Sequence, residues 1–193
     1  VIGRLGADYA IRESRRFGFE GEIWAIHPKL DELEGVKVYR SVNDLPGVPD
    51  AAYIAVNAEA AIQAVGDLNK LGCGGAALYA SGFSEVGAEG VERQARLVEA
   101  AGDMPIIGPN CYGILNAVDK AVLWPDQHGC SAVEEGVAII TQSGNIGINL
   151  TMQQRGLPMA YMCTMGNQAA VNIADIVDVM LDDPRVTAIG LHI

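Results

Sequence analysis

Apolar positions along the chain follow two alternating periods. Short runs rich in β-branched and small apolar residues fall at 1–3, 23–26, 51–56, 75–80 and 104–107. Between them, helical patterns occupy 8–17, 58–71 and 89–101. Within 58–71, one helical face carries Ala60, Ala61, Ala64, Val65 and Leu68. Strands that alternate with helices are typical of βαβ units, so we predict an α/β fold with a parallel sheet.

The pattern loosens after Asn116 and then restarts. Residues 124–135 carry Pro125, Gly129 and Ser131 among polar groups, which is typical of a linker. Beyond this linker we expect a strand at 136–141, a helix at 145–155, a strand at 159–164, a helix at 172–181 and a strand at 187–193. The pattern therefore predicts two α/β units, over 1–130 and 131–193. Because strands are under way at both ends, we expect a fragment whose second unit is incomplete.

Composition narrows the class of protein. Half of the 193 residues are hydrophobic, but no run approaches the roughly 20 apolar residues of a membrane helix, and the start does not resemble a secretion signal. The four cysteines lack CxxC spacing, so we expect free thiols in a cytoplasmic protein and no metal site. A net charge of −11 argues against nucleic acid as a partner. It still permits an anionic small ligand held by backbone N–H groups and one lysine.

The first candidate site for a phosphate lies after the first two strands. Gly3, Gly6 and Ala7 form a turn into a helix, where backbone N–H groups can approach an anion, although an ordinary tight turn explains them equally well. Lys29 stands near the place where an NAD-binding fold has an acidic residue. A cation there suits a ligand with an extra phosphate on its adenosine, as NADP and coenzyme A (CoA) have; a solvated surface lysine is the alternative.

The second candidate site follows the strand at 136–141. Ser143 and Asn145 can cap the helix that begins there, and Gly144 allows a phosphoryl group to approach its N-terminus. A plain helix cap accounts for Ser143 equally well. Asn110 and Cys111 follow the fifth strand, at the carboxyl edge where open α/β sheets bind ligands. We expect the Cys111 thiol to be packed rather than nucleophilic, because no base is near it in the sequence.

Several segments, taken in order, resemble the NDP-forming acyl-CoA synthetases, the family related to the succinyl-CoA synthetase α subunit. These segments are 18–23 leading into 27–29, 39–41 with 45–46, 54–56, 80–85 (ASGFSE), 108–113 (GPNCYG), 141–144 (TQSG) and 166–167. The resemblance implies a Rossmann-like CoA-binding domain over 1–130. It implies a flavodoxin-like domain of the succinyl-CoA ligase type over 131–193, and we expect this domain to be incomplete.

The resemblance also implies a function: an acid–thiol ligase that joins a small carboxylic acid to CoA with ATP, through an acyl phosphate and a phosphohistidine. An ATP-grasp domain or subunit would bind ATP or ADP with Mg²⁺, and a homo-oligomer is compatible with the family. The implied CoA contacts are Gly3, Gly6, Ala7, Lys29, Val56, Asn57, Ser81, Gly82, Asn110 and Cys111. The implied phosphoryl site consists of Ser143, Gly144 and Asn145.

Three departures from the family pattern keep other functions open. The first loop is short, Asn57 replaces a usual Pro, and none of His27, His128 and His192 has the Gly-rich surroundings of the phosphorylated histidine. One alternative is a non-catalytic CoA-binding or regulatory module, such as those fused to protein acyltransferases. Another is an NADP-dependent oxidoreductase, which the second phosphate-type turn and the absence of an evident hydride-transfer constellation disfavour. The identity of the acid is not encoded in these motifs.

Overall fold

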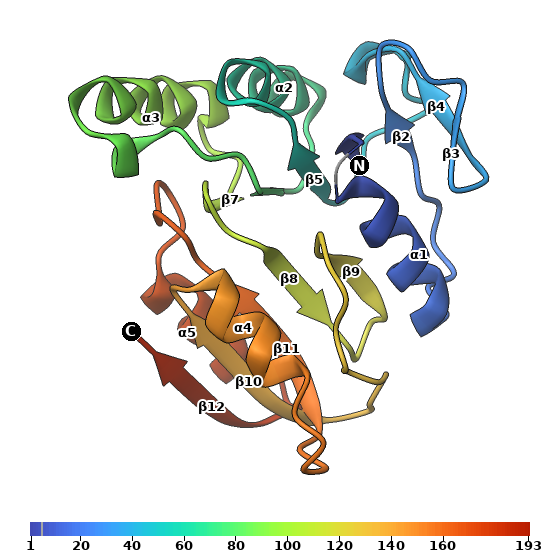
Figure 1. Cartoon of the computed structure of the whole chain (residues 1–193), viewed down its shortest axis with the longest axis vertical. Coiled ribbons are helices and arrows are strands. Elements are labelled where there is room, and N and C mark those ends of the chain that lie inside the picture. The colour runs from blue at the N-terminus through green and yellow to red at the C-terminus, as the bar shows by residue number, and fades with distance from the viewer. Residues whose placement is uncertain (5) are drawn as a thin grey trace.

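A computed structural model of the chain describes residues 1–4 and 6–193, and these residues form two sheets (Figure 1). The first has the strand order β3-β4-β2-β1-β5-β6-β7 and the second the order β12-β10-β11-β8-β9. No helix in the described ranges is both long and apolar enough to cross a bilayer. The α/β class predicted from the alternating pattern is confirmed.

The first sheet is parallel except at one edge, where β3 and β4 pair antiparallel. Its strands are β1 (Ile2–Gly3), β2 (Ala25–Ile26), β3 (Glu32–Leu33), β4 (Val36–Tyr39), β5 (Ala52–Ala55), β6 (Ala76–Leu78) and β7 (Ile106–Ile107). Its helices are α1 (Ala7–Phe17), α2 (Ala58–Leu71) and α3 (Ala88–Ala101), with short 3₁₀ turns at Val42–Asp44 and Ser84–Val86. The parallel pairing of β5 with β6 agrees with the expectation for 51–56 and 75–80.

Helix α2 shows how the local sequence builds this unit. Ala61, Val65 and Leu68 are buried on its inner face, as the helical period predicts. Asn57 begins the helix, because its side-chain oxygen accepts a 3.0 Å hydrogen bond from the N–H of Ala60. Gly72 ends it at a φ of 87°, a conformation that costs glycine little. Figure 1 shows α2 and α3 side by side along the sheet, joined by the ion pairs of Glu59 with Arg93 and Arg96.

The second sheet is mixed rather than wholly parallel. Strand β10 (Gly136–Thr141) lies between β11 (Met159–Thr164) and β12 (Val186–His192), parallel to both. Ahead of them, β8 (Gly113–Asn116) and β9 (Ala121–Leu123) form a hairpin, and β8 pairs antiparallel with β11. The chain therefore passes from one sheet to the other between β7 and β8, upstream of the boundary expected near residue 130. Four- and three-residue strands carry too few alternating positions to be recognised from sequence.

Two helices cover opposite faces of the second sheet. Helix α4 (Gly144–Thr151) packs its Ile148 and Leu150 on a hydrophobic cluster that includes Met162 and is also contacted by Ile139. Helix α5 (Ile173–Asp182) packs on the other face, against Ala138 and Ile140 among others. Because side chains alternate along β10, Ile139 points to the face covered by α4, whereas Ala138 and Ile140 point to the face covered by α5.

The two sheets are connected by direct contacts between units. The Ser14 hydroxyl of α1 donates to the carbonyl of Val122 in β9 and accepts from its N–H, both at 3.2 Å. The segment after β11 reaches the end of β7, where the N–H of Asn167 donates to the Pro109 carbonyl at 2.9 Å. These contacts bring the carboxyl ends of β6 and β7 next to the carboxyl end of β10.

Candidate functional site

The carboxyl edge of the first sheet collects most of the residues predicted to contact CoA. Because β2, β1, β5, β6 and β7 are parallel neighbours, the segments that follow them leave the sheet at the same edge and in that order. Their candidate residues are, in spatial order, Lys29, then Gly3, Gly6 and Ala7, then Val56 and Asn57, then Ser81 and Gly82, and finally Asn110 and Cys111. A scattered set in the sequence thus becomes a row in space.

The glycines of the first turn are required by packing. A Cβ on Gly3 would lie 2.2 Å from the Ala55 carbonyl oxygen, and one on Gly6 would lie 2.7 Å from Cβ of Pro125. Both residues also have positive φ, 110° and 80°. No side chain caps the helix at Gly6, so the N–H groups of the first turn of α1 have no partner within the helix. The glycines alone therefore do not identify a ligand.

Lys29 lies exposed at the turn after β2. The Nδ1 atom of His27 accepts hydrogen bonds from the N–H groups of Lys29 (3.1 Å) and Leu30 (3.2 Å), which makes His27 a structural residue of this turn. This assignment puts the imidazole proton on Nε2. Lys29 forms no ion pair with any residue of the described ranges, so its ammonium group can reach an anionic ligand.

Two predicted contact residues have structural functions of their own. The Asn57 side chain caps α2, and this explains its identity without a ligand. The N–H of Gly82 donates to Glu85 Oε1 at 2.5 Å, and its carbonyl accepts a hydrogen bond from Arg93. Both polar backbone groups of Gly82 are therefore engaged within the protein, which leaves exposed Ser81 as the polar contact of this turn.

A pocket of about 340 Å³ brings the end of the row together with the second candidate turn. It is lined by Tyr79, Ser81, Asn110, Cys111, Tyr112, Gln142, Ser143, Gly144 and Asn145. Residues from 79 to 145 therefore share one cavity between the two sheets. All of its lining side chains lack a formal charge at neutral pH, so the groups of this pocket that favour an anion are the backbone N–H groups and the helix dipole.

The turn after β10 is held by two local hydrogen bonds of Ser143. Ser143 Oγ accepts a long hydrogen bond (3.4 Å) from the N–H of Ile146, and the Ser143 N–H donates to Thr141 Oγ1 at 3.1 Å. These contacts hold the turn, and they leave the N–H groups of Gly144 and Asn145 without a partner inside the helix. Both residues line the pocket. Ser143 is therefore a helix cap, and the N–H groups of Gly144 and Asn145 after it remain without a partner inside the helix at the pocket wall.

Tyr112 contributes to the pocket and was not singled out by the sequence. A Cβ on Gly144 would lie 2.6 Å from Cδ1 of Tyr112, so the start of α4 packs directly on its ring. Tyr79 and Trp124 meet the same ring edge to face, at 5.8 and 5.3 Å between centroids. Burial, followed by Tyr79 and Asp126, raises the pKa of Tyr112, which keeps its hydroxyl neutral. Tyr112 lies within the GPNCYG segment, and this position was the signal in the sequence that could have identified it as a pocket residue.

The Cys111 thiol faces the interior. Its Sγ lies 3.5 Å from the Leu78 carbonyl oxygen and 3.7 Å from that of Ile107. Burial raises the pKa of the thiol to about 12, so it is not a thiolate at neutral pH. This agrees with the expectation of a packed cysteine, and Cys111 contributes only to the pocket wall.

His128 and His192 do not line the pocket, but the carbonyl of His192 accepts a 3.2 Å hydrogen bond from the N–H of Gln142, which does. His128 is buried beside Glu13 and against the ring of Phe17, and His192 Nδ1 lies 3.2 Å from Thr141 Oγ1 at the end of β12. In the part of the chain that the structure describes, no group of His, Cys, Asp and Glu is arranged to hold a metal ion.

Comparisons with known proteins agree with this geometry. A model of the CoA binding domain matches residues 6–117, and a model of the succinyl-CoA ligase like flavodoxin domain matches 134–193. The chain therefore belongs to the CoA-binding domain family. Its second part matches the succinyl-CoA ligase-like domain. The boundary expected near residue 130 falls in the interval between the two matches, and it stays a prediction.

Individual relatives are acyl-CoA synthases and ligases, several of them named as ADP-forming. The chain is 34% identical to a trans-feruloyl-CoA synthase from an unknown prokaryotic organism, over 99% of this chain and 28% of the relative. It is 31% identical to the α subunit of an ADP-forming acetate–CoA ligase II of Pyrococcus furiosus, over 90% of this chain and 38% of that subunit. The dinucleotide forming acetyl-coenzyme A synthetase 1 of Ca. Korarchaeum cryptofilum, solved with phosphate and ADP, superposes with a TM-score of 0.89 at 30% identity. That match covers all of this chain and 43% of the other, so the chain spans less than half of each of these relatives.

Proposed function

We propose that this chain is the CoA-binding part of an acid–thiol ligase that catalyses, reversibly, acid + CoA + ATP to acyl-CoA + ADP + phosphate. The observation that carries the proposal is the single pocket shared by Asn110 and Cys111 on one side and Ser143, Gly144 and Asn145 on the other. A thiol end and a phosphoryl group held at these two places would lie within one small cavity.

The strand order supports one orientation of CoA. Lys29 would contact the phosphate on the adenosine, because it is an exposed cation near one end of the row that pairs with no carboxylate in the described residues. The rest of the molecule would pass the turn of Gly3, Gly6 and Ala7, then Val56 and Asn57, then Ser81. Its thiol would reach Asn110 and Cys111, at the pocket.

The turn at Ser143 would hold the phosphoryl group of an acyl phosphate. The N–H groups of Gly144 and Asn145 and the positive end of the α4 dipole favour a dianion there. When the CoA sulfur bonds to the acyl carbon, the carbon–oxygen bond to the phosphoryl group breaks, and phosphate leaves with the thiol proton. The turn contributes by holding the leaving group before and during this step.

The remaining parts of the reaction would come from outside this chain. ATP or ADP with Mg²⁺ would bind to an ATP-grasp domain or subunit, and the phosphohistidine would come from the Gly-rich loop that the family has further downstream. A relative named as an α subunit supports the arrangement with a separate subunit. The buried free cysteines fit a reducing cytoplasm.

Calorimetric titration of the protein with CoA, dephospho-CoA, NADP and NAD tests the proposal. We expect binding of CoA, weaker binding of dephospho-CoA and no binding of the two nicotinamide cofactors. Tight NADP binding without CoA binding would overturn it. Relatives are named for feruloyl, acetate and 4-hydroxybutyrate substrates, so the turnover assay of the full-length protein should include aromatic and short aliphatic acids.

A further inference from the structure

The segment that follows β11 touches three parts of the site. The N–H of Gly166 donates to the Gln142 carbonyl at 3.1 Å, beside the Ser143 turn. The N–H of the next residue, Asn167, donates to the Pro109 carbonyl, at the end of the row of residues predicted to contact CoA. A Cβ on Gly166 would lie 2.2 Å from that same Pro109 oxygen, so only glycine fits here. The backbone of this segment thus joins the phosphoryl turn to the CoA edge.

The side chain of Asn167 extends this connection to the third part. Its Nδ2 donates to Glu85 Oε2 at 2.5 Å and to Gln94 Oε1 at 3.2 Å. The other oxygen of Glu85 accepts from the N–H groups of Gly82 (2.5 Å) and Phe83 (3.2 Å). One carboxylate therefore links an amide of the second unit to the turn that carries Ser81.

The polarity of this link is defined by the ionised state of Glu85. Burial alone would raise its pKa, but the hydrogen bonds from Asn167, Gly82 and Phe83 outweigh that effect, and the pKa lies below its usual value. An ionised carboxylate only accepts hydrogen bonds, so each of its partners must be a donor. Hydrogen bonds to a charged acceptor are also stronger than neutral ones.

We propose that Glu85 and Asn167 are positioning residues, which hold the Ser81 turn in register with the phosphoryl turn. Neither residue lines the pocket, so both act through the loops that do. The inference rests on the proposed function, because it assigns to these residues the alignment of the CoA thiol with the phosphoryl group. Small displacements of reacting groups are costly: about 1 Å can reduce a rate by roughly 10²-fold.

Exchanging donor and acceptor across the link tests this proposal in the full-length enzyme. Glu85→Gln would place an amide N–H₂ against that of Asn167, and Asn167→Asp would place two carboxylates together. We expect each single variant to lower kcat about tenfold or more, with KM for CoA changed less than about threefold. The double variant E85Q/N167D re-forms the link with reversed polarity, so its kcat should exceed the product of the two single effects by at least about tenfold.

Asp67→Asn is the matched control. Asp67 accepts hydrogen bonds of 3.0 Å from Gln63 on α2, so the variant changes a similar carboxylate–amide contact outside the site. Its kcat and KM should equal those of the unmodified enzyme. Thermal unfolding of every variant separates misfolding from misalignment.

Two results would overturn the positioning role: single variants with unchanged kcat, or a double variant whose unfolding temperature is restored while its kcat is not. A full-length enzyme that binds CoA but forms no acyl-CoA with any acid would instead contradict the proposed function itself. The two failures are therefore distinguishable.

Discussion

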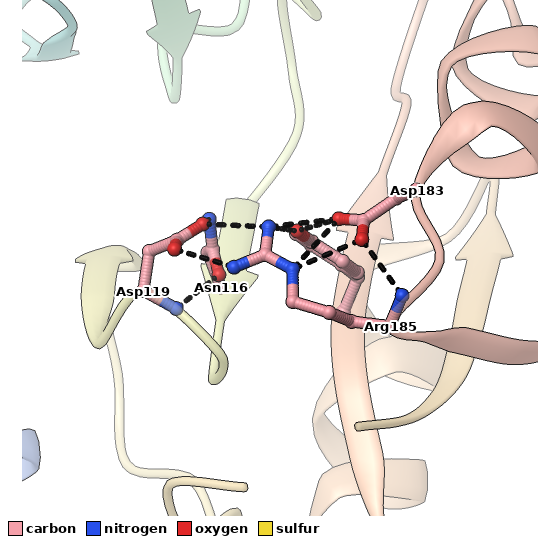
Figure 2. A network of polar contacts seen from close by, with 5 residues as sticks. Asn116, Asp119, Asp183 and Arg185 are labelled. Atoms are coloured by element: carbon pink, nitrogen blue, oxygen red, sulfur yellow. Dashed lines mark hydrogen bonds and ion pairs between the residues drawn. The ribbon is translucent and has the colours of Figure 1, made fainter. Parts of the chain in front are cut away.

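The polar groups at the two ends of the second sheet differ in their hydrogen bonding. At the amino end, Arg185 bonds Asp119 Oδ1 at 2.6 Å, Asp183 Oδ2 at 2.8 Å and the Tyr161 hydroxyl at 2.9 Å (Figure 2). Asn116 completes this network through a 2.9 Å hydrogen bond to Asp119. At the carboxyl end, Gly144 and Asn145 line an open pocket instead.

The difference distinguishes structural polar groups from binding groups. The guanidinium of Arg185, together with the Tyr161 hydroxyl, lowers the pKa of Asp183, and it likewise lowers that of Asp119. The amino-end network is thus satisfied without a ligand, and it connects the β8–β9 hairpin to the start of β12. Within residues 1–4 and 6–193, the N–H groups of Gly144 and Asn145 at the carboxyl end have no such partner, and we propose that they bind an anion.

The largest expected effect comes from a substitution at the carboxyl end of the second sheet. Gly144→Val should lower phosphoenzyme formation and turnover in the full-length enzyme by about 10²- to 10³-fold, because it would block approach to the N–H groups that we propose hold the phosphoryl group. CoA affinity, measured by calorimetry, should survive.

A steric clash of the new side chain with Tyr112 is an alternative cause of that loss, because residue 144 lies against the Tyr112 ring. Tyr112→Ala makes room for the new side chain, and the double variant Y112A/G144V should remain as impaired as Gly144→Val. Recovery to the level of Tyr112→Ala alone would mean that the turn is only a structural cap.

Lowering the pH should change the stability that His128 contributes but not the stability that the Arg185 network contributes. Burial, despite the opposing effect of Glu13, lowers the pKa of His128 from about 6.5 to about 4. A depressed pKa in the folded state means that the unfolded chain binds the proton first. Stability is therefore full above pH 6.5 and falls as the pH drops towards 4, by about 2 kcal/mol at pH 5.

Chemical denaturation at pH 7.5 and pH 5 measures this loss, and His128→Gln should remove most of the difference. The lowered pKa values of Asp119 and Asp183 keep the Arg185 network intact at both pH values, since its contribution is lost only below about pH 4. An equal acid dependence in His128→Gln would assign the effect to other groups.

A smaller effect concerns the far end of the CoA row. Lys29→Ala should weaken CoA binding about tenfold, as expected for loss of one exposed charge-assisted contact to phosphate. Dephospho-CoA should lose less if the contact is to the 3′-phosphate. Lys70→Ala, in the last turn of α2, is the control and should leave CoA affinity unchanged. An unchanged affinity in Lys29→Ala would identify Lys29 as an ordinary surface lysine.

The smallest effect tests the amino end. Arg185→Met should lower the unfolding temperature by about 2–4 °C, a modest change because Arg185 is partly exposed and solvent screens its ion pairs. CoA affinity should not change, since the network lies at the opposite end of the strands. A large loss of CoA binding in this variant would contradict the division between a structural end and a binding end.

Elements with a long local pattern were predictable from sequence. The range 58–71 expected for α2 is the range observed, because its apolar face, cap and terminal glycine are all local signals. The helix expected at 145–155 ends instead at Thr151, several residues before Gly156 and Pro158. Strands β8 and β9 were not expected, since strands this short are stabilised by their partners rather than by their own residues.

The sequence by itself determined the α/β class, the helix cap at Ser143 and the family, because each depends on neighbouring residues or on motifs in a fixed order. Only the tertiary structure decided that Tyr112 packs on Gly144, that Glu85 binds Asn167, and that Arg185 pairs with Asp119. The last two pairs are 82 and 66 residues apart in the chain. Such partners are selected by the packing of two sheets, which brings together side chains that carry no local signal of each other.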